Sequence, residues 1–285
     1  IITAVFAISY TVLAGMFSVV YTDVVNGVLM TVGILGALLF LIFHVGGLGE
    51  IAAVAESAGK WQLFGNWAAE RTGDISGPII AISFFVPTML LLMGDGNMYQ
   101  RIFSARDGGS AKKAVFFWII GVIVLESAIS MLGLTGAVAA AKGLIPDLVA
   151  DAQSALVNPT EGALLEARQA GSESVIPAIA RFAGLPIVLG ILLVSTMMAI
   201  IVSTADSFLL IPATNLTRDV YQRYIHPGAD ENQVLLISRG LVLVLGIIAF
   251  LLVSQFKTVL NAAFTAYNIY GTSITPALLA AFLWK

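Results

Sequence analysis

Long apolar runs alternate with polar segments along the whole chain. A membrane-spanning helix needs about 20 apolar residues to cross roughly 30 Å of hydrocarbon. Uninterrupted runs of this length favour helices over the alternating strands of a barrel. We therefore predict an all-α polytopic membrane helix bundle with about seven transmembrane helices. These helices cover residues 2–19, 23–45, 77–100, 113–141, 185–213, 233–255 and 259–284.

The connections between these spans differ in length. Only the tripeptide YTD (21–23) separates the first two spans, which predicts a tight reversal. The segments 46–76 and 142–182 are long and contain helix-like stretches such as EIAAVAES. The chain begins and ends inside apolar runs, so we expect residues 1–285 to form a single transmembrane domain, truncated at both ends, of a longer protein.

The composition agrees with a membrane protein. Hydrophobic residues make up 59% of the chain and charged residues 11%, whereas soluble domains carry about 25% charged residues. The expected surroundings are a lipid bilayer. The absence of cysteine excludes disulfides and thiolate metal sites. A net charge of −3 gives no basic footprint for nucleic acid. Since no nucleophile–base pair or phosphate-binding loop stands out, the sequence does not predict an enzyme.

The basic residues predict an orientation in the membrane. If alternate loops are assigned to two sides, the side with 101–113, 217–239 and the C-terminus has eight basic residues and four acids. The other side, with 46–76, 142–182 and 256–258, has six basic residues and nine acids. The short loop 101–113 has the densest basic cluster. The positive-inside rule therefore places the first side in the cytoplasm.

Four acids lie in or at the edge of apolar spans: Asp23, Asp95, Glu126 and Asp206. Ionisable groups at membrane depth are costly and normally face a cavity, a partner or an ion. Glu126 stands alone in its span, and we expect it to have a structural partner. The other three acids each belong to a larger group of polar residues.

The stretch VSTADSFLL (202–210) places a carboxylate and three hydroxyls in five residues. On a helix, Ser203, Asp206 and Ser207 share a face, with Thr204 beside it. Hydroxyl and carboxylate oxygens form a ligand set suited to a small hard cation. The alternative is that the Ser and Thr side chains only bond neighbouring helices, as they often do in membranes. The carboxylate of Asp206 favours the cation site, because a lone buried carboxylate needs a counter-charge.

Asp23 begins the second predicted span. One interpretation is an N-cap, in which Thr22 or Asp23 accepts hydrogen bonds from the first free backbone N–H groups of the helix. The other is that Asp23 reaches the Asp206 face and completes a cation site from a second helix. The sequence leaves both interpretations open.

Two other segments are candidates for solute contacts. Gly94-Asp95-Gly96 predicts a break in the third predicted membrane span, and broken helices build many transporter binding sites. The alternative is that these residues are the exit turn of the helix. In the last span, Asn268 is the single amide in AYNIYGTSITP. Its side chain either binds a polar solute or bonds a neighbouring helix.

Four stretches in order resemble the sodium:solute symporter family, whose members have a LeuT-type core of two inverted five-helix repeats. The stretches are YTVLAGMFSVVYTDVVNG (10–27), MYQRIFSARD (98–107), VSTADSFLLIPATNLTRDVYQRYI (202–225) and AYNIYGTSITPALLAAFLW (266–284). The resemblance covers essentially the whole chain, from about the fourth to the tenth core helix. It implies a partial LeuT-type inverted-repeat core. The first core helix, which supplies sodium and solute contacts in the family, has no counterpart here.

The resemblance implies that six positions bind sodium: Ser203, Thr204, Ile200, Asp23, Asp206 and Ser207. The first three match the main sodium site, with two hydroxyls and the backbone carbonyl of Ile200. The last three match a second sodium site found in some members. Asp206 stands where the family often has Ser, which either strengthens the site or makes it sensitive to protons.

The resemblance also implies solute contacts at Thr88, Asp95 and Asn268. The aromatic pair that binds sugar in some members is Leu91-Leu92 here, which argues against a sugar. The implied function is sodium-coupled uptake of a small polar solute, with Na⁺ as coupling ion, in the plasma membrane of a prokaryote. Two alternatives remain open. One is a solute-sensing membrane domain of a signalling protein such as a histidine kinase, and the other is a proton-coupled transporter.

Overall fold

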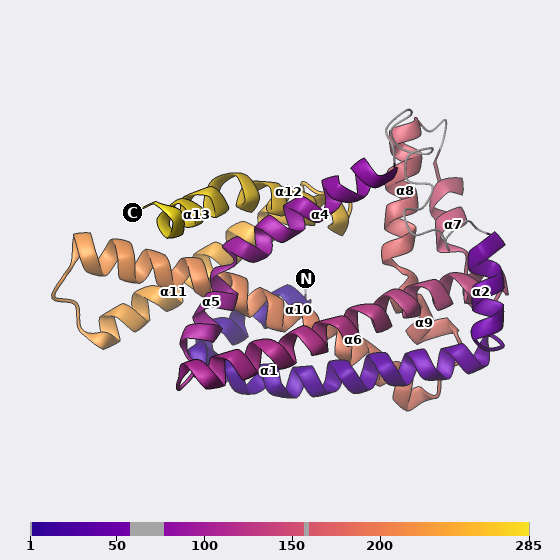
Figure 1. Ribbon diagram of the computed structural model, residues 1–285, viewed down its shortest axis with the longest axis horizontal. Coiled ribbons are helices and arrows are strands. Elements are labelled where there is room, and N and C mark those ends of the chain that lie inside the picture. Colours follow the sequence, from indigo (N-terminus) through magenta and orange to yellow (C-terminus); the bar gives the residue numbers. More distant parts are fainter. Residues whose placement is uncertain (1, 58–76, 157–159, 285) are drawn as a thin grey trace. The chain divides into compact units, whose positions relative to one another are not determined.

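The computed structural model describes residues 2–57, 77–156 and 160–284 (Figure 1). Every regular element within them is a helix, which confirms the all-α class. The elements are α1 (Ile2–His44), α2 (Leu48–Ser57), α4 (Gly77–Gly94), α5 (Gly96–Phe103), α6 (Gly108–Ala141), α7 (Leu148–Ser154), α8 (Glu161–Glu173), α9 (Val175–Phe182), α10 (Ile187–Asn215), the π-helical segment η1 (Leu216–Ile225), α11 (Glu231–Val253), α12 (Val259–Ile269), the π-helical segment η2 (Tyr270–Ile274) and α13 (Thr275–Leu283).

Four helical stretches in the described residues are long and apolar enough to cross a membrane. They are Tyr21–His44, Gly108–Ala141, Ile187–Ile225 and Glu231–Val253. Helices α4 and α5 form a fifth candidate if they are taken as one broken span, because they bend by 41° at Asp95. These five stretches match five of the seven predicted spans, and the chain is an integral membrane protein.

The remaining two predicted spans, 2–19 and 259–284, are helical but have a different form. Residues 259–283 form a continuous run of α12, η2 and α13, which is not among the candidate stretches of the described residues. Residues 2–19 lie in α1, where the Tyr10 hydroxyl donates to Thr22 Oγ1 at 2.8 Å. A straight helix would separate these residues by about 18 Å. The chain therefore bends sharply between them, near the predicted reversal at 21–23.

The chain divides into two compact units. The first unit consists of Ile1–Leu35 and Ile187–Phe256, and in it α10 packs against α11. Helix α1 approaches α10 closely at Gly33, where an added Cβ would lie 2.0 Å from Thr196 Oγ1. Thr196 donates from this hydroxyl to the Leu29 carbonyl at 2.9 Å. A side chain at position 33 would therefore separate the two helices.

The second unit consists of Gly36–Pro186 and Lys257–Lys285. Its long helix α6 packs against α2 and α9, α7 pairs with α8, and α4 packs against α12, η2 and α13. The turn between α1 and α2 has positive φ angles of 106° at Gly46 and 91° at Gly47, which favour glycine. Lys142, which follows α6, stabilises this turn by donating to the Val45 carbonyl at 2.6 Å.

Candidate ion and solute sites

The middle of α10 carries the predicted oxygen-rich face in an unbroken α-helix. Asp206 and Ser207 are buried, at 1% and 5% exposure. Ser203 is half-buried one turn earlier, and Thr204 lies on the exposed side of the helix. The half-buried Ile200 precedes them on the same helix. Three of the four polar residues of this stretch therefore lie on or beside the packed side of α10, as their spacing predicts.

Asp23 meets this face from α1. The Ser203 hydroxyl donates to Asp23 Oδ1 at 2.5 Å, across 180 residues of sequence. The charge of Asp23 also acts on Asp206. Because α1 runs through residue 23 without interruption, Asp23 lies inside a helix. The N-cap interpretation is therefore wrong, and the structure brings Asp23 together with the α10 face.

Thr11 is a contact that the sequence reasoning missed. It is buried, and its hydroxyl donates both to Asp206 Oδ1 and, at 2.8 Å, to the Ala7 carbonyl. A hydroxyl has a single proton, so Thr11 cannot fully satisfy both acceptors at once. The only signal in the sequence is a hydroxyl within an apolar run, which is also typical of a helix-packing Thr.

The first unit therefore brings side-chain oxygen atoms from two helices around a buried carboxylate. Asp206 forms no salt bridge within the part of the chain that the structure describes. Those residues also contain no cluster of three or more His, Cys, Asp or Glu side chains that would suit a transition metal. Hydroxyls, a carbonyl and carboxylates are the ligands that a hard cation prefers.

The predicted break around Asp95 is present in the second unit. Helix α4 ends at Gly94, and Asp95 caps α5 by accepting a hydrogen bond from the Asn97 backbone N–H at 3.0 Å. Thr275, which is fully buried, donates to the Leu90 carbonyl at 2.7 Å. A Cβ at Gly94 would lie 2.6 Å from the Thr275 hydroxyl. The last turn of α4 therefore packs closely against the start of α13.

The three predicted solute contacts all lie in this unit, on α4, at its end and on α12. Thr88 is half-buried on α4. Asn268 is exposed, and its backbone carbonyl accepts from Thr272 Oγ1 at 2.7 Å. Helix α12 packs against α4. The two helices that carry these residues are therefore neighbours, and Asp95 lies at the end of one of them.

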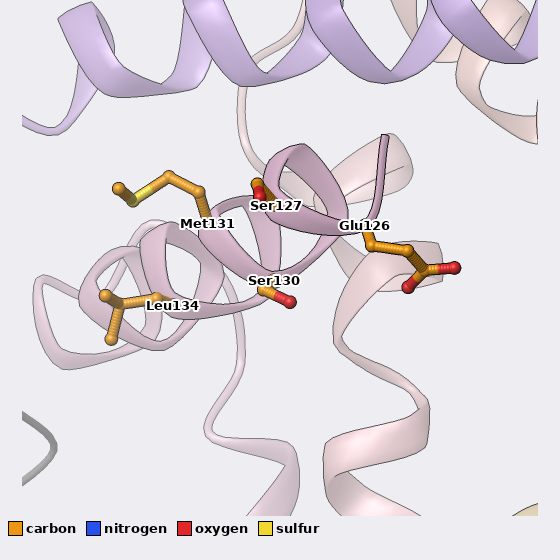
Figure 2. A pocket seen from close by; sticks show the side chains of 5 residues that line it. All are labelled: Glu126, Ser127, Ser130, Met131 and Leu134. Carbon is orange, nitrogen blue, oxygen red and sulfur yellow. The ribbon is translucent and has the colours of Figure 1, made fainter. Parts of the chain in front are cut away.

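Glu126 lines a shallow cavity of about 460 Å³ at the middle of α6 (Figure 2). All the residues that line it belong to α6: Glu126, Ser127, Ser130, Met131 and Leu134. Figure 2 shows the carboxylate and the Ser130 hydroxyl extending away from the helix axis. Among the described residues no ion pair involves Glu126. Its structural partner stays a prediction.

Comparison with known proteins finds a family model and several relatives that match the chain. The model of the sodium:solute symporter family matches residues 1–285. The chain is 24% identical over 287 residues to the high-affinity proline transporter PutP of Bacillus subtilis, covering 100% of this chain and 54% of that protein. It is 24% identical over 293 residues to the sodium/glucose cotransporter of Vibrio parahaemolyticus, covering 99% and 52%.

A human relative has a similar level of identity. The high affinity choline transporter 1 is 24% identical over 292 residues, covering 100% of this chain and 45% of that protein. The chain thus spans about half the length of the curated relatives it matches. Because the family model matches residues 1–285, this chain belongs to the sodium:solute symporter family.

Proposed function

We propose that this chain forms part of a symporter that couples the inward flow of Na⁺ to the uptake of a small polar solute. The observation that carries the proposal is the meeting of Asp23 and Thr11 with the Ser203–Ser207 face of α10. Membership of a transporter family supports transport rather than an enzymatic reaction. The relatives are named for proline, glucose and choline, and these names leave the solute of this chain open.

The charge balance of the α10 face supports a bound cation. Asp206 and the Ala7 carbonyl both accept from one hydroxyl of Thr11, and Asp23 adds a second carboxylate nearby. In a medium of low dielectric constant, two neighbouring carboxylates are unfavourable unless a positive charge joins them. A sodium ion among these oxygens would supply that charge without requiring imidazole or thiolate ligands.

The six proposed ion ligands divide into two groups. Ser203, Thr204 and the Ile200 carbonyl would hold one sodium ion, and Asp23, Asp206 and Ser207 a second. The contact between Ser203 and Asp23 joins the two groups, so one ion would influence the other. Coupling follows if sodium binding favours the conformation that also binds solute.

Thr88, Asp95 and Asn268 are the proposed solute contacts. The break between α4 and α5 supports this proposal, because the chain direction changes at Asp95 and leaves backbone groups outside the regular helical pattern. The packing of α12 against α4 brings the helix of Asn268 to the same part of the unit. A carboxylate, a hydroxyl and an amide suit a polar solute.

Uptake by the purified protein in proteoliposomes tests this function. A sodium gradient is expected to accelerate uptake of the solute, and Ser203→Ala or Asp23→Asn should raise the half-saturating sodium concentration about tenfold or more. The expected size follows from the loss of a hydrogen bond to a charged group. Glu126→Gln is the control, because Glu126 lies on α6 in the other unit. Uptake driven by a pH gradient without sodium would refute sodium coupling.

A further inference from the structure

A groove lies between α5 and the first turns of α6, at the end of the second unit that carries the α5–α6 loop. Its volume is about 260 Å³. Met98, Arg101 and Ile102 line it from α5, and Val115 and Trp118 line it from α6. The groove therefore combines apolar walls, an indole and a guanidinium. The proposed function makes no use of these five residues.

The loop beside the groove is strongly basic. Arg101, Arg106, Lys112 and Lys113 are all exposed. The one acid in the loop, Asp107, caps α6 by accepting from the Ser110 backbone N–H at 2.8 Å and from its hydroxyl at 3.0 Å. These hydrogen bonds hold the pKa of Asp107 below its usual range. The local charge is positive even with this acid ionised.

A second acid, Asp95, also lines the groove. It lies at the start of α5, about 9 Å along the helix from Arg101, and it is engaged in capping that helix through the Asn97 N–H. The two ends of the groove therefore differ in charge, and an anionic group is favoured only at the Arg101 end.

The length of α6 and the residues at its start indicate the depth of the groove in the membrane. Its 34 residues span about 51 Å, which exceeds the roughly 30 Å hydrocarbon core. Lys112 and Lys113 precede the long apolar run of this helix. Trp118 follows them with 46% exposure, and exposed Trp is enriched at the membrane interface. The groove thus lies at the level of lipid headgroups and upper acyl chains.

We propose that this groove binds one anionic phospholipid. The phosphate pairs with Arg101, and the glycerol and upper acyl chain lie against Met98, Ile102, Val115 and Trp118. Basic pockets between membrane helices suit such headgroups. The apolar walls favour a lipid over a soluble anion, and the cations beyond the groove attract the anionic leaflet as a whole.

Trp118 provides a reporter for the test. The purified protein is placed in phosphatidylcholine vesicles that contain brominated phosphatidylglycerol or brominated phosphatidylcholine, and tryptophan quenching is measured as the brominated lipid is increased. Trp118→Phe identifies the part of the signal that arises at the groove. Phosphatidylglycerol is expected to quench Trp118 at lower mole fraction than phosphatidylcholine does.

Two matched variants separate the groove from diffuse surface charge. Arg101→Gln should weaken the phosphatidylglycerol preference about fivefold, whereas Arg101→Lys, which keeps the charge, should retain most of it. Arg106→Gln removes a cation of the same loop that does not line the groove, and should have a smaller effect.

Three results would overturn the proposal. The first is equal quenching by the two lipids. The second is equal loss of preference in Arg101→Gln and Arg106→Gln, which would show a general electrostatic attraction to the membrane surface. The third is displacement by inorganic phosphate at low concentration, which would show a site for a soluble anion. Since the readout is lipid contact and not uptake, the proposal can fail while sodium-coupled transport holds.

Discussion

Replacing Thr11 by Val tests the ion site at the residue that the sequence reasoning missed. Val has nearly the same shape as Thr but lacks the hydroxyl that donates to Asp206 and to the Ala7 carbonyl. Asp206 is only 1% exposed, so water cannot replace the lost donor. A hydrogen bond to a charged group contributes about 1.5–3 kcal/mol, which corresponds to about ten- to one-hundred-fold in an equilibrium constant.

The assay compares sodium dependence with stability. We expect Thr11→Val to raise the half-saturating sodium concentration for uptake by that factor, because the Asp206 carboxylate loses the group that orients it. Sodium that binds the folded protein also raises its thermal midpoint, and the variant should need more sodium for the same rise. Thr11→Ser keeps the hydroxyl and should restore most of the sodium affinity.

Thr31→Val is the matched control, because the Thr31 hydroxyl donates to the Gly27 carbonyl of its own helix at 2.8 Å. It removes the same atoms from the same helix, at a hydroxyl whose hydrogen bond stays within α1. If Thr11→Val and Thr31→Val lowered stability equally and left the sodium requirement unchanged, Thr11 would be a packing residue. The proposed ion site would then lose its contact to the first part of α1.

Three further predictions concern packing and charge. Gly33→Ala should lower the stability of the purified protein by about 1–3 kcal/mol, because its Cβ would lie 2.0 Å from Thr196 Oγ1; Thr196→Ala should recover part of the loss in thermal unfolding. Glu173→Ala should speed hydrogen exchange at the start of α12 about fivefold, since its carboxylate accepts from the first two N–H groups of that helix at 3.1 and 2.9 Å. Lys142 lowers the pKa of Glu50, mainly through its hydrogen bond and to a smaller extent through its charge. The stabilisation from this pair is therefore present above the unfolded pKa of about 4.3 and lost as pH falls through the lower folded pKa. Hydrogen exchange of α2 should show this loss, and Lys142→Met should abolish the dependence.

Local patterns in the sequence predicted much of the fold. Five of the seven spans predicted from the apolar runs match candidate membrane stretches, and Gly94-Asp95-Gly96 identified the break between α4 and α5. Both signals are local, because run length and backbone freedom are properties of a few neighbouring residues. The helical spacing of Ser203, Asp206 and Ser207 likewise predicted their common face.

Long-range contacts were harder to predict. The interpretation of Asp23 as an N-cap fails because α1 continues through this residue. The bend in α1 is evident only from the long-range hydrogen bond between Tyr10 and Thr22. The π-helical segment η2 lies within the last predicted span, and no strong local signal in the sequence indicates it. Thr11 meets Asp206 across 195 residues. Nothing in the neighbours of Thr11 distinguishes such a contact from ordinary helix packing.

The division of the chain separates the proposed ligands in a way that makes coupling measurable. All six proposed sodium ligands lie in the first unit, and the three proposed solute contacts lie in the second. A variant such as Ser203→Ala therefore replaces a proposed ion ligand of one unit, and its effect on solute binding can be measured separately. Coupling between two ligands is reciprocal. The factor by which saturating sodium improves solute affinity must equal the factor by which saturating solute improves sodium affinity. Ser203→Ala should lower both factors equally, and Asn268→Ala should do the same from the other unit. A variant that weakened binding of its own ligand but left the shared factor unchanged, measured as equilibrium binding, would show that the replaced residue does not contribute to the coupling.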